Sequence, residues 1–197
     1  MAIGSEASMS RIVSKLVGAV ITFGSIGIMS GACVEAEGRI FIEKFVAPGD
    51  AGCGSEDETA FNSRTFVECF DGACVGSARC AHVANHMVPS LDNESNNNGV
   101  ETSIVILHSY DLRYISDDVD LGTADATVQI TAPVEPDAFS SISLSYLTAE
   151  ASAALGSAIE SGATSSLIIG VRFYGRTTGG LEVETPETFM GVTVTGL

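Results

Sequence analysis

The chain has 197 residues, and its 25 acidic residues against 9 basic ones give a formal net charge of −16. This length suits one domain with an extension better than two separate domains. Nucleic-acid binding requires clustered Lys and Arg side chains that displace counterions, and the sequence has no such cluster, so we exclude nucleic acid as a partner. Acidity of this kind chiefly favours solubility outside the cell.

An apolar leader is expected at the start of the chain. Residues 16–29 form an uncharged run, preceded by Arg11 and Lys15 and followed by the small residues 30–32. This order predicts a signal peptide over residues 1–32. The run is shorter than the roughly 20 apolar residues that a membrane-spanning helix needs. The segment from Met9 is the tidier leader because it has two positive charges and no acid, so we expect translation to begin at Met9.

Cys33 directly follows this leader. Gly31, Ala32 and Cys33 resemble the lipobox of bacterial lipoproteins, whose cysteine is acylated and becomes the mature N-terminus. Ser30 stands where the lipobox usually has a leucine-like residue, and ordinary secretion after Ala32 is the alternative. Because the apolar run reaches almost to the cysteine, we favour lipid attachment at Cys33. The predicted protein is exported and held by its N-terminal lipid to the outer membrane or the cell surface.

Four further cysteines lie within a polar, Gly-rich stretch: Cys53, Cys69, Cys74 and Cys80. An even number of cysteines in an exported chain predicts two disulfides, and the sequence leaves their pairing open. A zinc site is the alternative, but the spacings of these cysteines fit the usual zinc patterns poorly. We therefore expect residues 33–80 to form an anchor and a disulfide-stapled segment ahead of a domain at residues 81–197.

Period-two alternation dominates the second half of the chain. In residues 99–115 the even-numbered positions from Val100 to Tyr114, His108 included, are predicted to face the core. Residues 126–133 and 140–146 repeat the alternation, with Val128, Ile130, Ile142 and Leu144 among the predicted inward residues. Strands with one polar face favour antiparallel pairing.

One segment has helical spacing instead. Residues 148–162 predict an amphipathic helix that Thr148 caps and Gly162 ends. After it, residues 166–185 form a predicted hairpin around Gly179 and Gly180, and residues 189–197 form a last strand. Seven or eight short strands with one helix predict an all-β fold, an immunoglobulin-like antiparallel β-sandwich.

Three stretches carry a loose likeness to a known group. The lipobox-like cysteine together with residues 82–88, 94–114 and 171–194 resembles uncharacterised exported lipoproteins of the myxobacterial kind. The resemblance implies a β-sandwich and no assigned chemistry. Members of that group tend to have a cysteine near the very end, and this chain ends in residues 192–197 without one.

The acidic loop at residues 116–125 is the best candidate for a metal site. Carboxylate oxygens are preferred calcium ligands, which makes calcium a candidate cofactor at Asp117, Asp118, Asp120 and Asp125, with a plain acidic loop as the alternative. Residues 92–99 are better explained as a solvated turn. His82 and His86 have a spacing that suits two metal ligands only on a helix, and a strand is the equal alternative.

The sequence contains no hydrolase elbow, phosphate loop, complete dinucleotide fingerprint or zinc-protease motif. Without Trp and with few aromatic residues, it is also a poor candidate for a sugar site that depends on stacking. We therefore expect a non-enzymatic, lipid-anchored envelope protein that binds a protein or cell-surface partner. One alternative is a structural subunit that self-associates through an edge strand, formed by residues 39–46 or 189–197. The other is a hydrolase with a site assembled in space, for which His108 is the residue to test.

Overall fold

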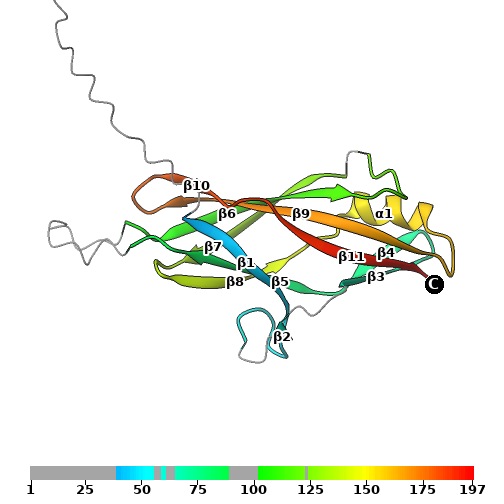
Figure 1. The fold of residues 1–197 in the computed structure, drawn as a ribbon, viewed down its shortest axis with the longest axis horizontal. Coiled ribbons are helices and arrows are strands. Elements are labelled where there is room, and N and C mark those ends of the chain that lie inside the picture. The colour runs from blue at the N-terminus through cyan, green and yellow to red at the C-terminus, as the bar shows by residue number, and fades with distance from the viewer. Residues whose placement is uncertain (1–38, 56–58, 61–64, 89–101, 123) are drawn as a thin grey trace, which may run out of the picture. The chain divides into compact units, whose positions relative to one another are not determined.

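The structure, a computed structural model, describes residues 39–55, 59–60, 65–88, 102–122 and 124–197. These residues all belong to one unit, residues 35–197. Within them, eleven strands form two sheets and one short helix lies beside the strands (Figure 1). The predicted leader at 1–32, Cys33 and the connector at 92–99 lie outside the described residues.

The two sheets differ in size. The smaller has the strand order β2 (Thr59–Ala60), β1 (Ile40–Ala47), β5 (Arg79–Asn85) and β8 (Ala138–Leu144). The larger has the order β4 (Ala73–Gly76), β3 (Thr65–Phe70), β11 (Thr188–Gly196), β9 (Thr164–Thr177), β6 (Val105–Ile115) and β7 (Ala126–Val134), and β10 (Glu182–Glu184) also pairs with β9. The predicted all-β sandwich is confirmed.

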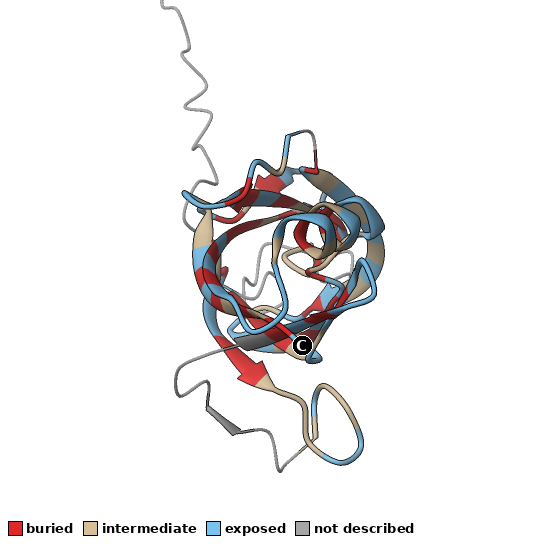
Figure 2. Ribbon diagram, turned by 90° about the vertical axis from the view of Figure 1, so that its right-hand side faces the viewer, coloured by how far each residue is buried: buried red, intermediate tan, exposed pale blue. Residues whose placement is uncertain are grey.

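The core lies between the two sheets. Seen along the long axis, the buried residues line the inner sides of the strands (Figure 2). Tyr110 of β6 and Phe173 of β9 are among the largest fully buried side chains, and their rings meet at 5.2 Å in a tilted arrangement. The period-two predictions for β7 and β8 are confirmed, because Val128 and Ile130 face inward and Ile142 and Leu144 are buried.

The prediction for β6 is only half right. Tyr110, Leu112 and Tyr114 are buried as expected, but the register against β9 shifts between Leu107 and Ser109, so β6 has one more residue there than its partner. This β-bulge changes which face each residue meets. Before the bulge Val105 and Leu107 are buried, and His108, which was predicted to face the core, is exposed.

Two features of the N-terminal half differ from the general expectation of an antiparallel sandwich at residues 81–197. β3 pairs with β11 in parallel, from Thr65 opposite Val192 to Cys69 opposite Gly196, although all other pairs are antiparallel in the described residues. Parallel strands need a long connection, which the chain between β3 and β11 provides. The sandwich is also not confined to residues 81–197. β1, β3 and β4 belong to the same two sheets, because Val67, Cys69 and Cys74 bury their side chains in the common core.

Both predicted disulfides form. Cys53 is bonded to Cys80 over a separation of 27 residues, and Cys69 is bonded to Cys74, directly opposite it on β3 and β4. A cross-link stabilises mainly by restricting the unfolded chain, and more so for a longer loop. The first bond is therefore worth about 3.5 kcal/mol and the second about 2 kcal/mol in the chain-entropy description. Cys53–Cys80 joins the loop after β1 to the second residue of β5.

The helix α1 (Ala149–Ala158) closes one edge of the larger sheet. Thr148 caps it as predicted, since its hydroxyl accepts a hydrogen bond from the Ala151 amide at 3.1 Å. The Ser152 hydroxyl accepts from the Cys74 amide at 2.8 Å and donates to the Cys74 carbonyl at 2.9 Å, on edge strand β4. A side chain at Gly156 would collide with the backbone of Gly72. The helix thus occupies hydrogen-bonding groups that an edge strand would otherwise present to another chain.

Two tyrosines of β6 hold the chain that leads from β8 to the helix. The Tyr110 hydroxyl accepts a hydrogen bond from the Ser145 amide at 2.9 Å. The Tyr114 hydroxyl donates to the Tyr146 carbonyl at 2.8 Å and accepts from the Thr148 amide at 3.2 Å. Because these hydroxyls satisfy buried backbone groups, their loss would cost about 1–3 kcal/mol each.

The buried tyrosines predict sensitivity to alkaline pH. Burial raises the pKa of Tyr110, Tyr114 and Tyr146 above the usual 10.0. The folded protein then holds these protons more tightly than the unfolded chain, so stability is complete below pH 10 and falls as the pH rises further. Each such group removes at most about 1.4 kcal/mol per pH unit above that point, until the pH reaches its raised pKa. Three of the four tyrosines should ionise, by absorbance at 295 nm, only as the β-sheet circular dichroism is lost.

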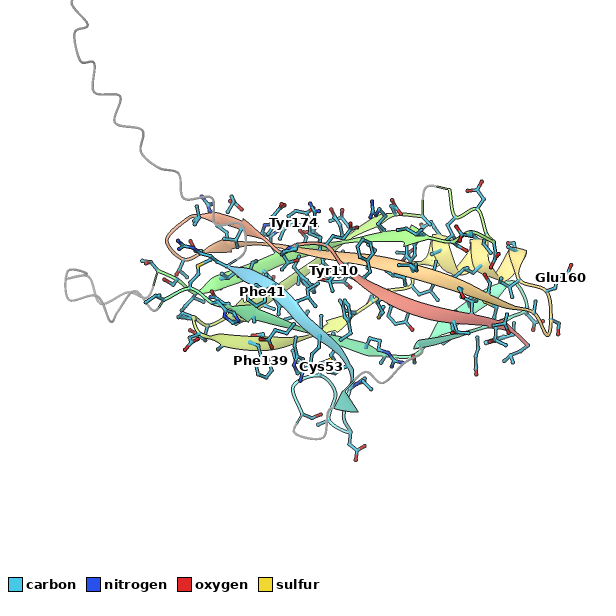
Figure 3. All side chains as sticks on the ribbon, in the orientation of Figure 1. Phe41, Cys53, Tyr110, Phe139, Glu160 and Tyr174 are labelled. Carbon is cyan, nitrogen blue, oxygen red and sulfur yellow. A yellow bond between two sulfur atoms is a disulfide. The ribbon has the colours of Figure 1, made fainter. Side chains whose placement is uncertain are left out.

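The Tyr174→Phe variant is the control, because Tyr174 lies on the outer side of the sheet and its removal leaves only the three buried phenols to follow (Figure 3). Ionisation of all three while the circular dichroism stays native would contradict the prediction.

Candidate functional site

A shallow trough of about 380 Å³ lies on the outer face of the larger sheet. It crosses β7, β6 and β9, and the residue before β11 reaches into it. Its polar lining residues are Asp111, Arg113, Asp125, Thr127, Arg172, Tyr174 and Glu187. In Figure 3 Tyr174 lies on the outer side of the strands, whereas Tyr110 lies between the sheets.

Strand register puts these side chains together. After the bulge, Asp111 and Arg113 of β6 lie on the face opposite to the buried Tyr110 and Leu112. On β9, Arg172 and Tyr174 alternate with the buried Val171 and Phe173. Successive residues of a strand point to opposite faces, so each strand delivers polar side chains to the trough without breaking its buried face.

Gly170 forms the floor of the trough. It lies opposite Arg113 on β6 and opposite Phe189 on β11. A side chain at this position would collide with the carboxylate of Glu187 and crowd the ring of Phe189. The glycine therefore leaves the space across which Glu187 reaches Arg113.

Asp111 is held by two hydroxyl groups. The Thr127 hydroxyl donates to one of its carboxylate oxygens at 2.6 Å, and the Tyr174 hydroxyl donates to the other at 2.9 Å. Burial, and then the hydrogen bond to Asp111, raise the pKa of Tyr174 above 10.0. The phenol therefore keeps its proton at neutral pH and fixes the position of the Asp111 carboxylate.

Arginine side chains in and beside the trough are paired with glutamates. The pairs are Arg113–Glu187 at 2.8 Å, Arg172–Glu184 at 3.7 Å and Arg176–Glu182 at 3.2 Å. Thus three of the nine basic residues of the chain lie on the outward face of β6 and β9. Because Glu182 lies opposite Arg176 in the β9–β10 register, the hairpin aligns opposite charges across the strands.

An exposed apolar border adjoins the trough. Phe189 is 52% exposed, and the Arg113 guanidinium lies 5.7 Å from the centre of its ring. Ile168 and Ile115, which face each other on β9 and β6, are also exposed. The trough therefore has an apolar side next to a paired-charge side.

The predicted calcium ligands are not brought together. Asp118 accepts a hydrogen bond from the Ser165 hydroxyl, and Asp120 accepts from the Gly122 amide, each at 2.9 Å. Asp125 accepts from the Tyr114 amide at 2.9 Å, and Asp117 is exposed. Within the described ranges, no three His, Cys, Asp or Glu side chains are grouped to hold a metal ion. Asp118, Asp120 and Asp125 instead accept hydrogen bonds from separate parts of the loop and its neighbours, so they do not converge on one point.

His82 lies on β5 and His86 directly follows the end of this strand, so neither histidine is on a helix. A separation of four residues along a strand spans about 13 Å, too far for two ligands of one ion. His82 is buried and stacks on Phe139 at 4.6 Å, and His86 packs on Phe41 at 4.3 Å. The two histidines therefore cover aromatic rings on the smaller sheet.

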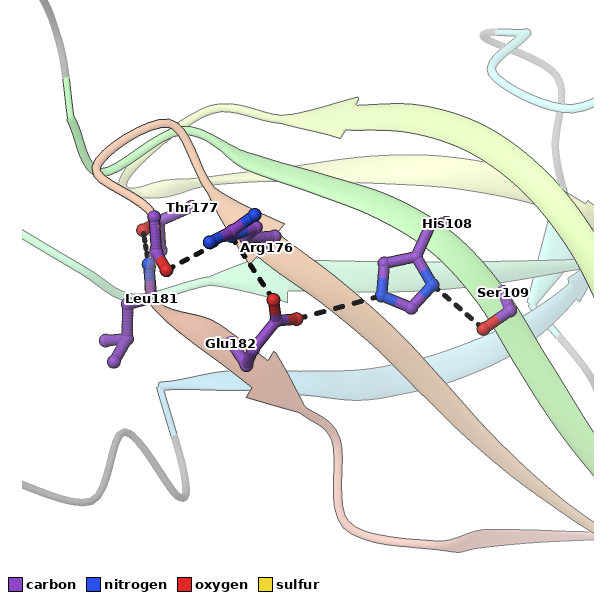
Figure 4. A network of polar contacts seen from close by, with 7 residues as sticks. His108, Ser109, Arg176, Thr177, Leu181 and Glu182 are labelled. Carbon is purple, nitrogen blue, oxygen red and sulfur yellow. Dashed lines mark hydrogen bonds and ion pairs between the residues drawn. The ribbon is translucent and has the colours of Figure 1, made fainter.

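His108 lies between a serine and a carboxylate (Figure 4). Its Nδ1 is 3.0 Å from the Ser109 hydroxyl, and its Nε2 is 3.9 Å from Glu182, which also pairs with Arg176. A nucleophilic serine must be able to reach its substrate. Ser109 belongs to the bulge and is only 5% exposed. The side chains of His108, Ser109 and Glu182 are therefore better explained as polar contacts at the bulge than as a catalytic triad.

The trough was not predicted from the sequence. One signal was present: Arg172, Tyr174 and Arg176 alternate on a strand, and Glu182 and Glu184 follow after the Gly179–Gly180 turn. Such a hairpin aligns opposite charges on one face.

The arrangement of the acidic loop predicts no calcium effect. A calcium site with a Kd of about 0.1 mM would add about 2.3 kcal/mol at about 5 mM calcium and raise the melting temperature by about 5–9 °C. We expect the melting temperature in about 5 mM CaCl₂ to equal that in the same concentration of MgCl₂. A rise specific to calcium that Asp120→Asn removes would contradict this.

No helix in the described part of the chain is long and apolar enough to cross a membrane. Comparison with known family models, with curated protein sequences and with solved structures finds no match. The resemblance to myxobacterial lipoproteins therefore stays a prediction from sequence, and the function has to be argued from the trough itself.

Proposed function

We propose that this chain is a non-enzymatic binding protein of the cell envelope, anchored by a lipid on Cys33, and that the trough is its binding site. The observation that carries the proposal is the set of polar side chains that neighbouring strands hold at fixed positions around Gly170. Fixed donors and acceptors on a rigid sheet bind a ligand without first having to be ordered.

The contacts within the trough support this role. Asp111 is fixed by two hydroxyls, and Arg113 is fixed by Glu187 at 2.8 Å. An arginine has five N–H donors and a carboxylate has about four acceptor sites, so these pairs leave hydrogen-bonding capacity for a ligand. The open shape of the trough admits part of a large molecule on the cell surface.

Self-assembly through strand edges is the less favoured function. β11, one of the two candidate strands, is paired with β3 on one side and with β9 on the other. β1 is paired along one side with β5, and β2 pairs with it on the other side only at Val46 and Ala47. A role as a subunit would therefore use the smaller sheet, and a ladder of oligomers in size-exclusion chromatography would favour it over a binding protein.

Substitutions in the trough should abolish binding to envelope material. The full chain, purified in detergent, is incubated with delipidated cell wall of the organism that encodes it, so that the lipid anchor finds no bilayer. We expect the Arg113→Ala/Arg172→Ala variant to bind at least about tenfold more weakly than the unchanged protein, a loss of about 1.4 kcal/mol. Sedimentation with the cell wall measures the bound fraction.

Arg176→Ala is the matched control. It removes an arginine and its glutamate pair on the same face, but Arg176 does not line the trough. Both variants should keep the circular dichroism and melting temperature of the unchanged protein, because exposed ion pairs contribute only about 0–1 kcal/mol. Equal binding by the Arg113→Ala/Arg172→Ala variant and the unchanged protein would exclude the trough as the binding site.

Replacing Cys33 should release the protein from the membrane. We expect the unchanged chain to fractionate with membranes and to show, by intact mass, a lipid on a mature N-terminus at Cys33 with four cysteines in disulfides. The Cys33→Ser variant should appear in the soluble exported fraction with the same melting temperature. An unmodified Cys33 in a soluble wild-type protein would show that the chain is secreted without an anchor.

A further inference from the structure

We infer, on the basis of the proposed function, that the ligand of the trough is a neutral, hydroxyl-rich carbohydrate chain. The inference concerns the class of ligand, and it follows from the charges, the hydrogen-bonding groups and the rings around Gly170.

Charge argues against an anionic ligand. Arg113 and Arg172, the two arginines that line the trough, are each paired with a glutamate, and Asp111 and Asp125 add further negative charge. The chain as a whole has a formal charge of −16. An anion would have to displace Glu187 from Arg113 and approach a negatively charged surface. The free energy that this costs exceeds what hydrogen bonds from the arginines to the anion would contribute.

Charge does not favour a cation either. Both oxygens of Asp111 accept hydrogen bonds from hydroxyls, and Asp125 accepts from the Tyr114 amide. Glu187 is paired with Arg113. Each carboxylate of the trough thus already has its own hydrogen-bond or ion-pair partner. The two guanidinium groups of Arg113 and Arg172 would also repel a cation.

Neutral hydroxyl groups suit the hydrogen-bonding capacity that remains on the arginines and carboxylates of the trough. A hydroxyl both donates and accepts, so it can accept from a free N–H of Arg113 or Arg172 and donate to a free lone pair of Asp111 or Glu187. Hydrogen bonds to charged partners are about twice as strong as those between neutral groups. A chain of sugars, which presents hydroxyls at regular intervals, can make several of these bonds at once.

Two rings flank the polar groups: Tyr174 lines the trough, and Phe189 belongs to the apolar border beside it. Tyr174 lies four residues along β9 from Gly170, and Gly170 lies opposite Phe189 on β11, so the rings are separated by about 13 Å along the strands. Phe189 is exposed, and an aromatic ring can cover the C–H face of a sugar. Among the described residues Tyr174 is the one aromatic ring that lines the trough, so hydrogen bonds contribute more than stacking. The distance between Tyr174 and Phe189 accommodates more than one sugar unit lying across β9 and β6.

The experiment treats the cell-wall material of the preceding binding assay in two ways. One portion is oxidised with periodate, which cleaves the vicinal diols of sugars, and another is digested with protease. We expect periodate to remove at least about 90% of the binding that depends on the trough, a tenfold loss or more, and protease to leave it unchanged. Raising NaCl to about 0.5 M should also leave binding unchanged, because a neutral ligand makes no screened charge contacts.

A second arm uses purified polysaccharides in native affinity electrophoresis, where the acidic chain migrates readily. Laminarin, galactomannan and soluble starch serve as neutral probes and polygalacturonate as the anionic probe. We expect the unchanged protein and Arg176→Ala to be retarded by neutral polymer, and Arg113→Ala/Arg172→Ala and Gly170→Val to migrate freely. Phe189→Ala, which keeps every polar group of the trough, should show reduced retardation.

The outcomes separate the two proposals. Cell-wall binding that depends on the trough but survives periodate, or that is lost with protease or in high salt, would overturn the carbohydrate inference and leave the binding function standing. Retardation by polygalacturonate alone would also overturn it. Cell-wall binding that is unaffected by the trough variants would overturn the binding site itself.

Discussion

The β-bulge at His108 and Ser109 determines which residues of β6, a central strand of the larger sheet, face the core. Before it, odd-numbered residues of β6 face the core, and after it Tyr110, Leu112 and Tyr114 do so. β9 keeps a single phase throughout, from Ser165 to Thr177. One additional residue on β6 therefore allows both halves of the strand to bury apolar side chains. Without this extra residue, either Val105 and Leu107 would face water, or Asp111 and Arg113 would enter the core unpaired. Burying an unpaired charge costs roughly several kcal/mol.

The bulge also determines which side chains of β6 reach the helix and which reach the outer surface. Tyr110 and Tyr114 reach from the inner face of β6 to backbone groups between β8 and α1. This fixes the start of the helix, and Ser152 then occupies the edge of β4. On the other face, the phase directs Asp111 and Arg113 into the trough. The trough is thus rigid because its side chains alternate with those that hold the sandwich together.

The sequence was sufficient where a pattern is complete within one segment. β7, β8, the Thr148 cap and the pair of disulfides could each be predicted from local alternation, capping chemistry or cysteine number. It was insufficient where the outcome depends on partners far apart in the chain. The parallel pairing of β3 with β11 has no local signal, and the bulge of β6 depends on its register against β9. The trough needs both strands in register before its residues meet, so separate strand predictions could not assemble it.

The ion pairs of the outer face are not explained by stability. Exposed pairs contribute about 0–1 kcal/mol each, so Arg113–Glu187 and Arg172–Glu184 add little to a sandwich that has two disulfides and a continuous core. Their effect is geometric, because each pair fixes a guanidinium and a carboxylate side by side on the outer face of the sheet. A surface of fixed, mutually neutralised charges attracts no ion at long range, but it presents strong donors and acceptors at contact distance. Recognition on such a surface depends on the positions of ligand hydroxyls more than on ligand charge, which is the property that distinguishes one sugar chain from another.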